Sequence, residues 1–362
     1  MLQTKFYHHA LISTVFLLIV LTFRGDTLKF RFNPGLIERY YQSQDITHEV
    51  SNRIFLSDGD IYLATGYIYA RGGDPSQNNF EHPPVVKYLF GFATLILGNP
   101  LIIQIIFGFI LPQLVYLLGT RISGNSLIGL LGAILIIIDP LFIDTLNQPL
   151  LDMGQTVFML GYFYLIFYDN KNWVGQGILL ALFAGCKFWI TPGFFIVLIT
   201  LYKYYRHEIN KEYIYHLAFS LVIYTLFYSQ SYIHEGLKFN LVWHMLKTLK
   251  YRLVHNTATY FGASVLLFTS GYWKSWWDSY GFVRGSTWSL LWPLSLGFSI
   301  NNVLVSLKKI RIDTLFLTEI IPISYLLFLG VQAPFPRYFL VILPFVYLSL
   351  SNLIVNRFIK NF

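Results

Sequence analysis

Long apolar runs separated by short polar segments dominate the chain from residue 101 onward. A bilayer-spanning helix needs about 20 mostly apolar residues, so this repetition predicts a polytopic, all-α membrane protein. An earlier run, Phe6–Phe23, follows Lys5 and has no small-residue cleavage site after it, which indicates a retained signal-anchor helix. The later runs cover 101–119, 126–143, 154–168, 173–186, 188–202, 213–230, 286–305, 315–331 and 338–355.

Two longer polar segments interrupt this series. Residues 24–83 are the most acid-rich part of the chain, and residues 231–285 form a second long segment. Within the second, from Gly236 to Leu253, apolar residues recur at every fourth position while Lys, Arg and His take other positions. This spacing predicts a basic amphipathic helix that lies in the membrane interface. We expect one transmembrane domain over residues 1–362, without a separate soluble domain.

The apolar run Val85–Gly98 decides the topology, because counting it as a crossing inverts every later loop. If it is re-entrant or interfacial, all the short basic loops fall on one side, which the positive-inside rule identifies as cytoplasmic. We therefore expect about ten spans (range about 9–12), with both termini inside and both long polar segments outside. The basic loops contain Arg121, Lys171, Lys203, Arg206, Lys211, Lys308, Lys309, Arg311, Arg357 and Lys360.

Composition agrees with this architecture. Of the 362 residues, 55% are apolar and 12% charged, against about half and a quarter in soluble domains, which excludes an ordinary soluble enzyme. The net charge of +8 does not indicate nucleic acid, because no soluble domain carries a basic face. The single cysteine, Cys186, cannot form an intrachain disulfide, and no Cys/His cluster has the spacing of metal ligands.

Ionisable residues beside the apolar runs gather on the outward side in this topology. An unpaired charge in hydrocarbon costs a few kcal/mol or more, so such residues are candidates for function. Acids that face cations at one depth would suit an anionic lipid substrate and a general base. The residues are Asp58, Asp60, Glu81, His82, Lys87, Asp139, Asp144, Asp152, Lys187 and Arg337.

Several of these residues stand in recognisable motifs. The first outward loop of the protein O-mannosyltransferases contains a D-E-x-x-aromatic pattern and, later, an H-P-P-L-x-K motif. The chain resembles this loop in three stretches, Asp58–Tyr62, Arg71–Pro75 and His82–Lys87. That family and its aminoarabinose-transferase relatives belong to the multispanning GT-C glycosyltransferases. Four further segments are similar to family elements in the same order: Asp139–Asp152, Gly185–Trp189, Trp288–Pro293 and Pro336–Pro344.

The resemblance implies a GT-C fold and the transfer of a mannose-like or other sugar from a polyprenyl-phosphate donor to a hydroxyl of a lipid, glycan or protein acceptor. Asp58 would be the general base of an inverting reaction, with Asp60 as the alternative because Gly59 replaces the usual Glu. Donor phosphate would be bound by Lys187, Arg337, His82 and Lys87. Acceptor or sugar would be positioned by Asp152, Asp139, Glu81 and Trp288.

Each of these roles has a structural alternative. Asp58 could be a solvated acid or a helix N-cap, Lys87 could snorkel to the headgroups, and Lys187 could be a connector in a helical hairpin. His82 and Asp152 could be structural, Asp139 a helix stop, and Arg337 an exception to the positive-inside bias. Asn147 replaces the family's Arg, and the family's large lumenal insert is absent, which leaves a protein acceptor open.

Two further alternatives concern chemistry. Asp58 and Asp60 could hold a divalent cation, but the resemblance assigns phosphate to Lys and Arg, so we expect neither a metal nor another cofactor. A transporter or flippase for a lipid-linked or anionic solute is the rival function, although the chain has no inverted repeat. The bias toward Ile, Lys, Asn, Phe and Tyr indicates a prokaryotic cytoplasmic membrane, with the site facing outward into the cell envelope.

Overall fold

The computed structural model describes residues 2–44, 54–255, 260–274, 281–332 and 334–359. Within these ranges the chain is helical apart from loops and one antiparallel hairpin, in which Trp273 of β1 (Tyr272–Lys274) pairs with Val283 of β2 (Phe282–Arg284). The helices of the first half are α1 Leu2–Phe23, α2 Gly25–Lys29, α3 Gly35–Gln44, α4 Asp58–Ala70, α5 Val85–Leu97, α6 Ile102–Ser123, α7 Ser126–Ile137, α8 Pro140–Thr145, α9 Asp152–Tyr168 and α10 Trp173–Cys186. Those of the second half are α11 Ile190–Tyr205, α12 Lys211–Leu226, α13 Ser229–Glu235, η2 Gly236–Lys238, α14 Leu241–Val254, α15 Ala263–Ser270, α16 Leu291–Lys308, α17 Thr314–Leu329, η3 Pro336–Val341, α18 Leu343–Ile354 and η4 Val355–Ile359.

The predicted apolar runs are helices, but three of them are interrupted. The run 213–230 breaks between α12, which ends at Leu226, and α13, which begins at Ser229. The run 126–143 splits at Asp139, because the residue before a proline avoids helical geometry and Asp139 instead caps α8 with its side chain. The run 338–355 splits into the 3₁₀ segment η3 and helix α18. Within the described residues, two helices are long and apolar enough for a membrane span, Phe6–Phe23 and Ile102–Ser123. The expected count of about ten spans therefore stays a prediction.

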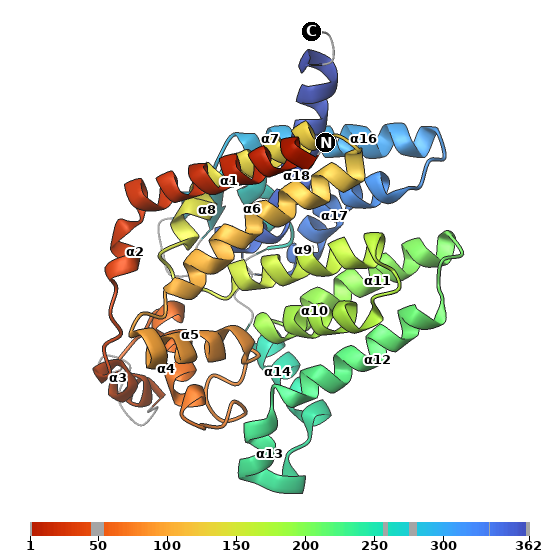
Figure 1. Cartoon of the computed structure of the whole chain (residues 1–362). Helices are drawn as coiled ribbons and strands as arrows, with labels where there is room; N and C mark the ends of the chain where they lie inside the picture. The colour runs from red at the N-terminus through yellow and green to blue at the C-terminus, as the bar shows by residue number, and fades with distance from the viewer. Residues whose placement is uncertain (1, 45–53, 256–259, 275–280, 333, 360–362) are drawn as a thin grey trace.

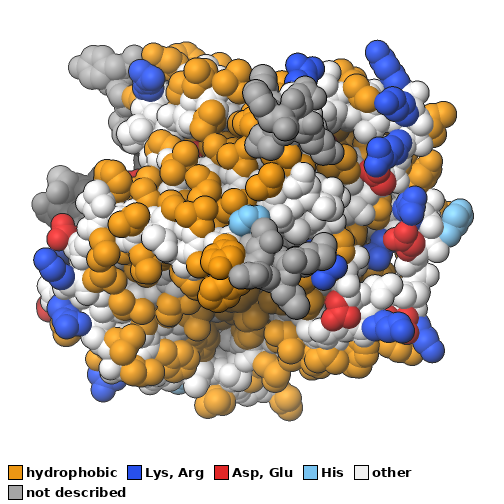
Figure 2. All heavy atoms as spheres, turned by 45° about the horizontal axis from the view of Figure 1, so that its top comes forward, with side chains coloured by type: hydrophobic (Ala, Val, Ile, Leu, Met, Phe, Trp, Pro, Cys, Tyr) orange, Lys and Arg blue, Asp and Glu red, His pale blue; other side chains and the backbone are white. Residues whose placement is uncertain are grey.

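The helices are arranged so that the acidic segment and the basic turns lie at opposite ends of the bundle. In Figure 1, α2 and α3 lie at the left edge, whereas the α11–α12 and α16–α17 turns lie at the right edge. Those right-hand turns hold Arg206, Lys211, Lys309 and Arg311. Figure 2 shows Lys and Arg at both edges, with more of them at the right, beside a face covered largely by apolar side chains. The orientation in the membrane stays a prediction.

Helices α4 and α5 form a short hairpin joined by the loop of residues 71–84. Helix α5 has 13 residues, about 20 Å at 1.5 Å per residue, which is less than the roughly 30 Å of a bilayer core. The two helices touch through backbone, since a Cβ placed on Gly91 would lie 1.9 Å from the carbonyl oxygen of Gly66. Helices α7 and α10, with 12 and 14 residues, are of similar length, so the expectation that Val85–Gly98 does not cross stays a prediction.

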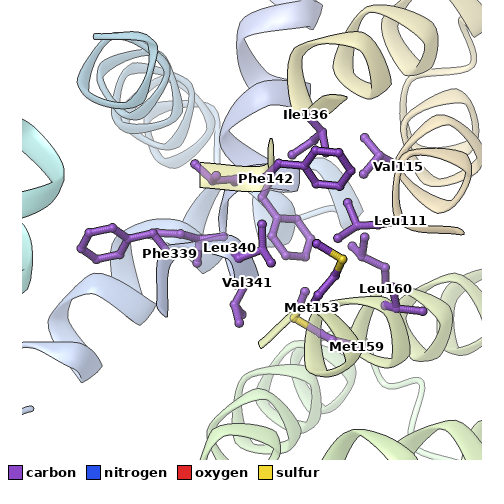
Figure 3. Packing of buried hydrophobic residues seen from close by; sticks show 14 of the residues in the cluster. Leu111, Val115, Ile136, Phe142, Met153, Met159, Leu160, Phe339, Leu340 and Val341 are labelled. Atoms are coloured by element: carbon purple, nitrogen blue, oxygen red, sulfur yellow. The ribbon is translucent and has the colours of Figure 1, made fainter. Parts of the chain in front are cut away.

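The apolar core holds the two segments that carry most of the candidate site. Met153 of α9 and the η3 residues Leu340 and Val341 pack together with α6, α7 and α8, as Figure 3 shows. All three side chains are fully buried. Because Met153 follows Asp152, and η3 also carries Arg337, this packing fixes both charged side chains relative to each other.

The predicted amphipathic helix is present as α14 and begins five residues later than expected. Asn240 ends the preceding loop and caps the helix, with its side-chain oxygen accepting from Trp243 N at 3.1 Å. Residues 236–238 form the 3₁₀ turn η2 instead. The predicted apolar stripe faces the protein, since Leu241 and Met245 pack against a buried cluster that contains Tyr224 and Tyr228. Val242, Trp243 and Leu246 are the exposed apolar residues, and the interfacial placement of α14 stays a prediction.

Candidate functional site

The first charged pair joins the start of α4 to η3. Ser57 caps α4: its hydroxyl accepts from Asp60 N at 3.1 Å and donates to Asp60 Oδ2 at 2.8 Å. Asp60 is therefore engaged in starting the helix, in a capping arrangement. Asp58, one residue after the cap, is free of this network and binds Arg337 Nη2 at 2.5 Å. The Asp58 side chain is 46% exposed, so a solvent-borne or lipid-borne group can reach it.

The second pair is buried and joins α9 to the connector between α10 and α11. Asp152 lies in the first turn of α9, where a carboxylate suits the helix N-terminus, and it accepts a hydrogen bond from Lys187 Nζ. The Lys187 ammonium also lies 4.0 Å from the centre of the Tyr338 ring. Burial lowers the pKa of Lys187 to about 8, although the Asp152 carboxylate opposes that shift.

A third contact brings His82 against a cation that the sequence did not single out. Arg252 Nη2 of α14 lies 2.6 Å from His82 Nε2 and 2.9 Å from Nδ1. His82 Nδ1 is also 3.2 Å from the carbonyl oxygen of Lys187. Burial, followed by the charges of Arg252, Lys87 and Lys187, lowers the pKa of His82 well below its usual value. His82 is therefore a neutral partner of Arg252 at physiological pH.

These side chains border a pocket of about 240 Å³ between α9, α11, α14, α17 and η3. Asp152, Lys187 and Arg252 line it, together with Tyr338, which follows Arg337. Aromatic and aliphatic side chains of α17, including Tyr325 and Phe328, form the rest of the wall. Cations beside a partly apolar hollow are the arrangement that an anionic lipid headgroup needs.

Arg252 is the functional candidate that sequence reasoning missed. Its position on a basic amphipathic helix of the outward segment was visible in the sequence. The four-residue spacing shows which side of the helix is apolar, but it cannot show that the end of the helix turns toward His82 and the pocket. The guanidinium also lies 5.2 Å from the Phe188 ring, which adds a cation–π contact.

Lys87, expected to bind phosphate or to snorkel, does neither, and this expectation is corrected. Its side chain is completely buried, and its ammonium donates to His82 O at 2.7 Å, Asn79 O at 2.9 Å, Asn79 Oδ1 at 3.1 Å and Tyr69 Oη at 3.1 Å. Four acceptors saturate the three hydrogens of an ammonium. Lys87 therefore anchors the loop that carries His82.

Three of the residues expected to position acceptor or sugar are engaged elsewhere. Asp139 is buried and caps α8, where its carboxylate accepts from Leu141 N at 2.8 Å. It also accepts from Trp292 Nε1 at 2.8 Å and from the Tyr347 hydroxyl. These contacts agree with its alternative role as a helix stop. Glu81 accepts from Asn79 Nδ2 at 2.5 Å and braces the same loop as Lys87. Trp288 donates to Phe268 O at 3.0 Å. Among the expected positioning residues, Asp152 is the one that lines the pocket.

The described residues hold no group of three His, Cys, Asp or Glu side chains placed to bind a metal ion. Asp58 and Asp60, the two carboxylates considered for that role, face different partners, Arg337 and Ser57. Anion-binding groups, by contrast, converge on the pocket.

Comparison with known proteins identifies the fold. No family model matches the chain, and no curated protein matches its sequence. Among solved structures, ArnT from Cupriavidus metallidurans bound to undecaprenyl phosphate aligns with a TM-score of 0.60 and 12% identity over 89% of this chain and 59% of that one. The apo form of ArnT gives 0.58 and 13%, over 89% and 58%.

The Archaeoglobus fulgidus oligosaccharyltransferase in its apo form gives a TM-score of 0.52 and 14% identity over 99% of this chain and 52% of that one. Both neighbours are GT-C glycosyltransferases, so the resemblance to that class and to its aminoarabinose transferases is confirmed for the fold. The chain spans between about half and three-fifths of the length of these structures.

Proposed function

We propose that this protein is a membrane glycosyltransferase that transfers a sugar from a polyprenyl-phosphate carrier to an acceptor hydroxyl at the outward membrane face. One observation carries the proposal: the Asp152–Lys187 pair lines a headgroup-sized pocket, and the Asp58–Arg337 pair lies beside it, since Arg337 precedes the lining residue Tyr338. The GT-C fold and the undecaprenyl phosphate named with one ArnT structure support a lipid monophosphate as the carrier.

In the proposed reaction Asp58 is the general base. The acceptor oxygen attacks the anomeric carbon of the donor sugar, and its proton passes to Asp58. The bond between that carbon and the phosphate oxygen breaks, and its electron pair leaves with the polyprenyl phosphate. Attack from the face opposite the phosphate inverts the anomeric configuration. Asp60 is the weaker candidate for the base because its carboxylate is held by Ser57 at the start of α4.

Cations stabilise the leaving group in this scheme. A polyprenyl monophosphate is anionic at neutral pH, so its departure needs positive charge rather than a general acid. Lys187, Arg252 and Arg337 supply that charge from three different elements, and no step requires a metal ion or nucleotide. Arg337 must exchange Asp58 for the phosphate, which frees the Asp58 carboxylate when the donor is present.

The test compares two neighbouring carboxylates in purified protein reconstituted in lipid. Radiolabelled polyprenyl-phosphate mannose and polyprenyl-phosphate aminoarabinose are supplied with a membrane lipid extract as acceptor, and the freed carrier phosphate is measured. Asp58→Asn should lower the rate by about 100-fold or more. Asp60→Asn, the matched control, should stay within a few-fold of wild type, and a chelator should change neither. A fully active Asp58→Asn variant would contradict the mechanism.

The rival function, a transporter or flippase, predicts a different product. It would move a lipid-linked donor between leaflets and leave the bond between sugar and phosphate intact. Sealed vesicles with donor in one leaflet distinguish the two functions, since intact donor would appear in the other leaflet without any free carrier phosphate.

A further inference from the structure

Gln155 places a side-chain amide in the pocket without a partner. It belongs to α9, one turn after Asp152, and only 2% of its surface is exposed. It is one of the residues that line the pocket. Its amide nitrogen Nε2 is buried and has no hydrogen-bond partner among the described residues. Buried polar groups are nearly always paired, so an orphan donor at a pocket wall points to a ligand that supplies the acceptor.

The neighbouring polar groups already have partners within the protein. Lys187 pairs with Asp152, and the Tyr325 and Thr191 hydroxyl groups bond to each other. Of the described side chains that line the pocket, Gln155 Nε2 and Arg252 Nε are the buried donors left over. Arg252 is a cation and belongs with Lys187 and Arg337 as a phosphate-binding candidate. Gln155 is neutral, so it is suited to a neutral group of the ligand.

The position of Gln155 separates it from the phosphate-binding end. Three residues along a helix correspond to about 4.5 Å, so Gln155 lies that much farther from the outward start of α9 than Asp152. Tyr325 and Phe328 of α17 line the same pocket. A volume of about 240 Å³ is below the usual range for a drug-sized ligand and cannot hold a polyprenyl chain. It suits a single sugar ring with its phosphate at the charged end.

We propose that Gln155 determines sugar specificity, by donating a hydrogen bond from its amide to a ring hydroxyl of the donor sugar. The inference rests on the proposed glycosyltransferase function. A neutral amide both donates and accepts, as a sugar hydroxyl does, whereas the phosphate is served by Lys187, Arg252 and Arg337. The apolar faces of Tyr325 and Phe328 suit the carbon-bound side of a sugar ring.

The test uses Gln155→Leu, with Gln42→Leu on the exposed surface of α3, outside the pocket, as the matched control. The donor is the one that the wild-type protein turns over fastest, assayed with its deoxy analogues, each lacking one ring hydroxyl. For the complete donor, Gln155→Leu should lower kcat/KM by about 10- to 100-fold, the usual effect of one buried hydrogen bond to a ligand. For one particular deoxy donor, wild type and Gln155→Leu should be equal. Gln42→Leu should follow wild type throughout.

Binding of the sugar-free carrier phosphate separates specificity from folding. Its Kd should be unchanged within about twofold in Gln155→Leu, because phosphate and chain do not contact the amide. Gln155→Glu should retain more activity than Gln155→Leu, because the ring hydroxyl can then donate its hydrogen to the carboxylate, so that a hydrogen bond between the two groups is kept. Equal losses on every deoxy donor, or weakened binding of the sugar-free carrier, would overturn the inference. A wild-type protein that releases no carrier phosphate from any donor would refute the proposed function instead.

Discussion

Removing one member of the buried Asp152–Lys187 pair should destabilise the protein more than removing both. The two side chains are 2% and 10% exposed, so each single substitution leaves an uncompensated charge in a nearly dry site. Breaking such a pair costs about 3–5 kcal/mol. The Tyr338 ring, 4.0 Å from the ammonium, still stabilises Lys187 in Asp152→Asn by about 1–2 kcal/mol, which places that variant near 3 kcal/mol.

The double variant Asp152→Leu with Lys187→Met replaces both charges by apolar groups of similar size. It should lie within about 1 kcal/mol of wild type, because buried ion pairs roughly break even against apolar isosteres. The assay is reversible unfolding in mixed micelles, followed by the loss of helical circular dichroism, on the wild type, both single variants and the double variant. If the losses of the single variants simply add in the double variant, the two charges do not compensate each other and the reasoning is wrong.

A ligand arm of the same experiment connects stability to phosphate binding. Polyprenyl phosphate at about 100 times its Kd should stabilise the wild type by about 2.7 kcal/mol. In Asp152→Asn the phosphate also neutralises the stranded Lys187 ammonium, so its stabilising effect should be larger. In Lys187→Met it should be smaller. An equal effect in all three proteins would show that Lys187 does not meet the phosphate.

Three other results are expected. Lys187 has a pKa of about 8, so it is cationic below that pH and neutral above it. The KM for the donor should therefore rise by up to about tenfold per pH unit above pH 8. Lys187→Arg should abolish that rise. Lys87→Met should cost about 3 kcal/mol of stability because it strands buried carbonyls, yet leave donor KM unchanged; a raised KM would return Lys87 to the phosphate site. Gly91→Ala should lower the unfolding midpoint sharply, because the new Cβ would lie 1.9 Å from the carbonyl oxygen of Gly66. Gly297→Ala should be neutral or stabilising, because no atom lies within 4 Å of its new Cβ.

The fold and the charged residues Asp58, Lys187 and Arg337 follow from features that a sequence carries directly, although their pairing was not predicted. Apolar runs predict helices because burial and span length constrain composition over many residues. Asp58, Lys187 and Arg337 were predicted on one side of the membrane from loop charges, and the structure brings each of them to the pocket or beside it.

What the sequence could not predict depends on backbone groups and on helix orientation. Lys87 follows a histidine–proline motif, but the carbonyl groups of Asn79 and His82 that hold it are present at every residue and leave no mark in a sequence. Asp139 looked like a positioning acid because its partners Trp292 and Tyr347 are distant along the chain. Arg252 was hidden because its contact with His82 depends on how α14 packs against the loop.

The Asp58–Arg337 contact also bears on the synthesis of the protein. The two residues are 279 positions apart, and chains grow at about 5–20 residues per second, so roughly 15–55 seconds pass between their additions. During that interval the nascent chain exposes Asp58 without its arginine. The bundle also lacks Trp292 and Tyr347, which hold Asp139. The proposed site is therefore complete only after the last helices have been made, and a chain that ends before Arg337 has Asp58, the proposed base, without the cation that binds it.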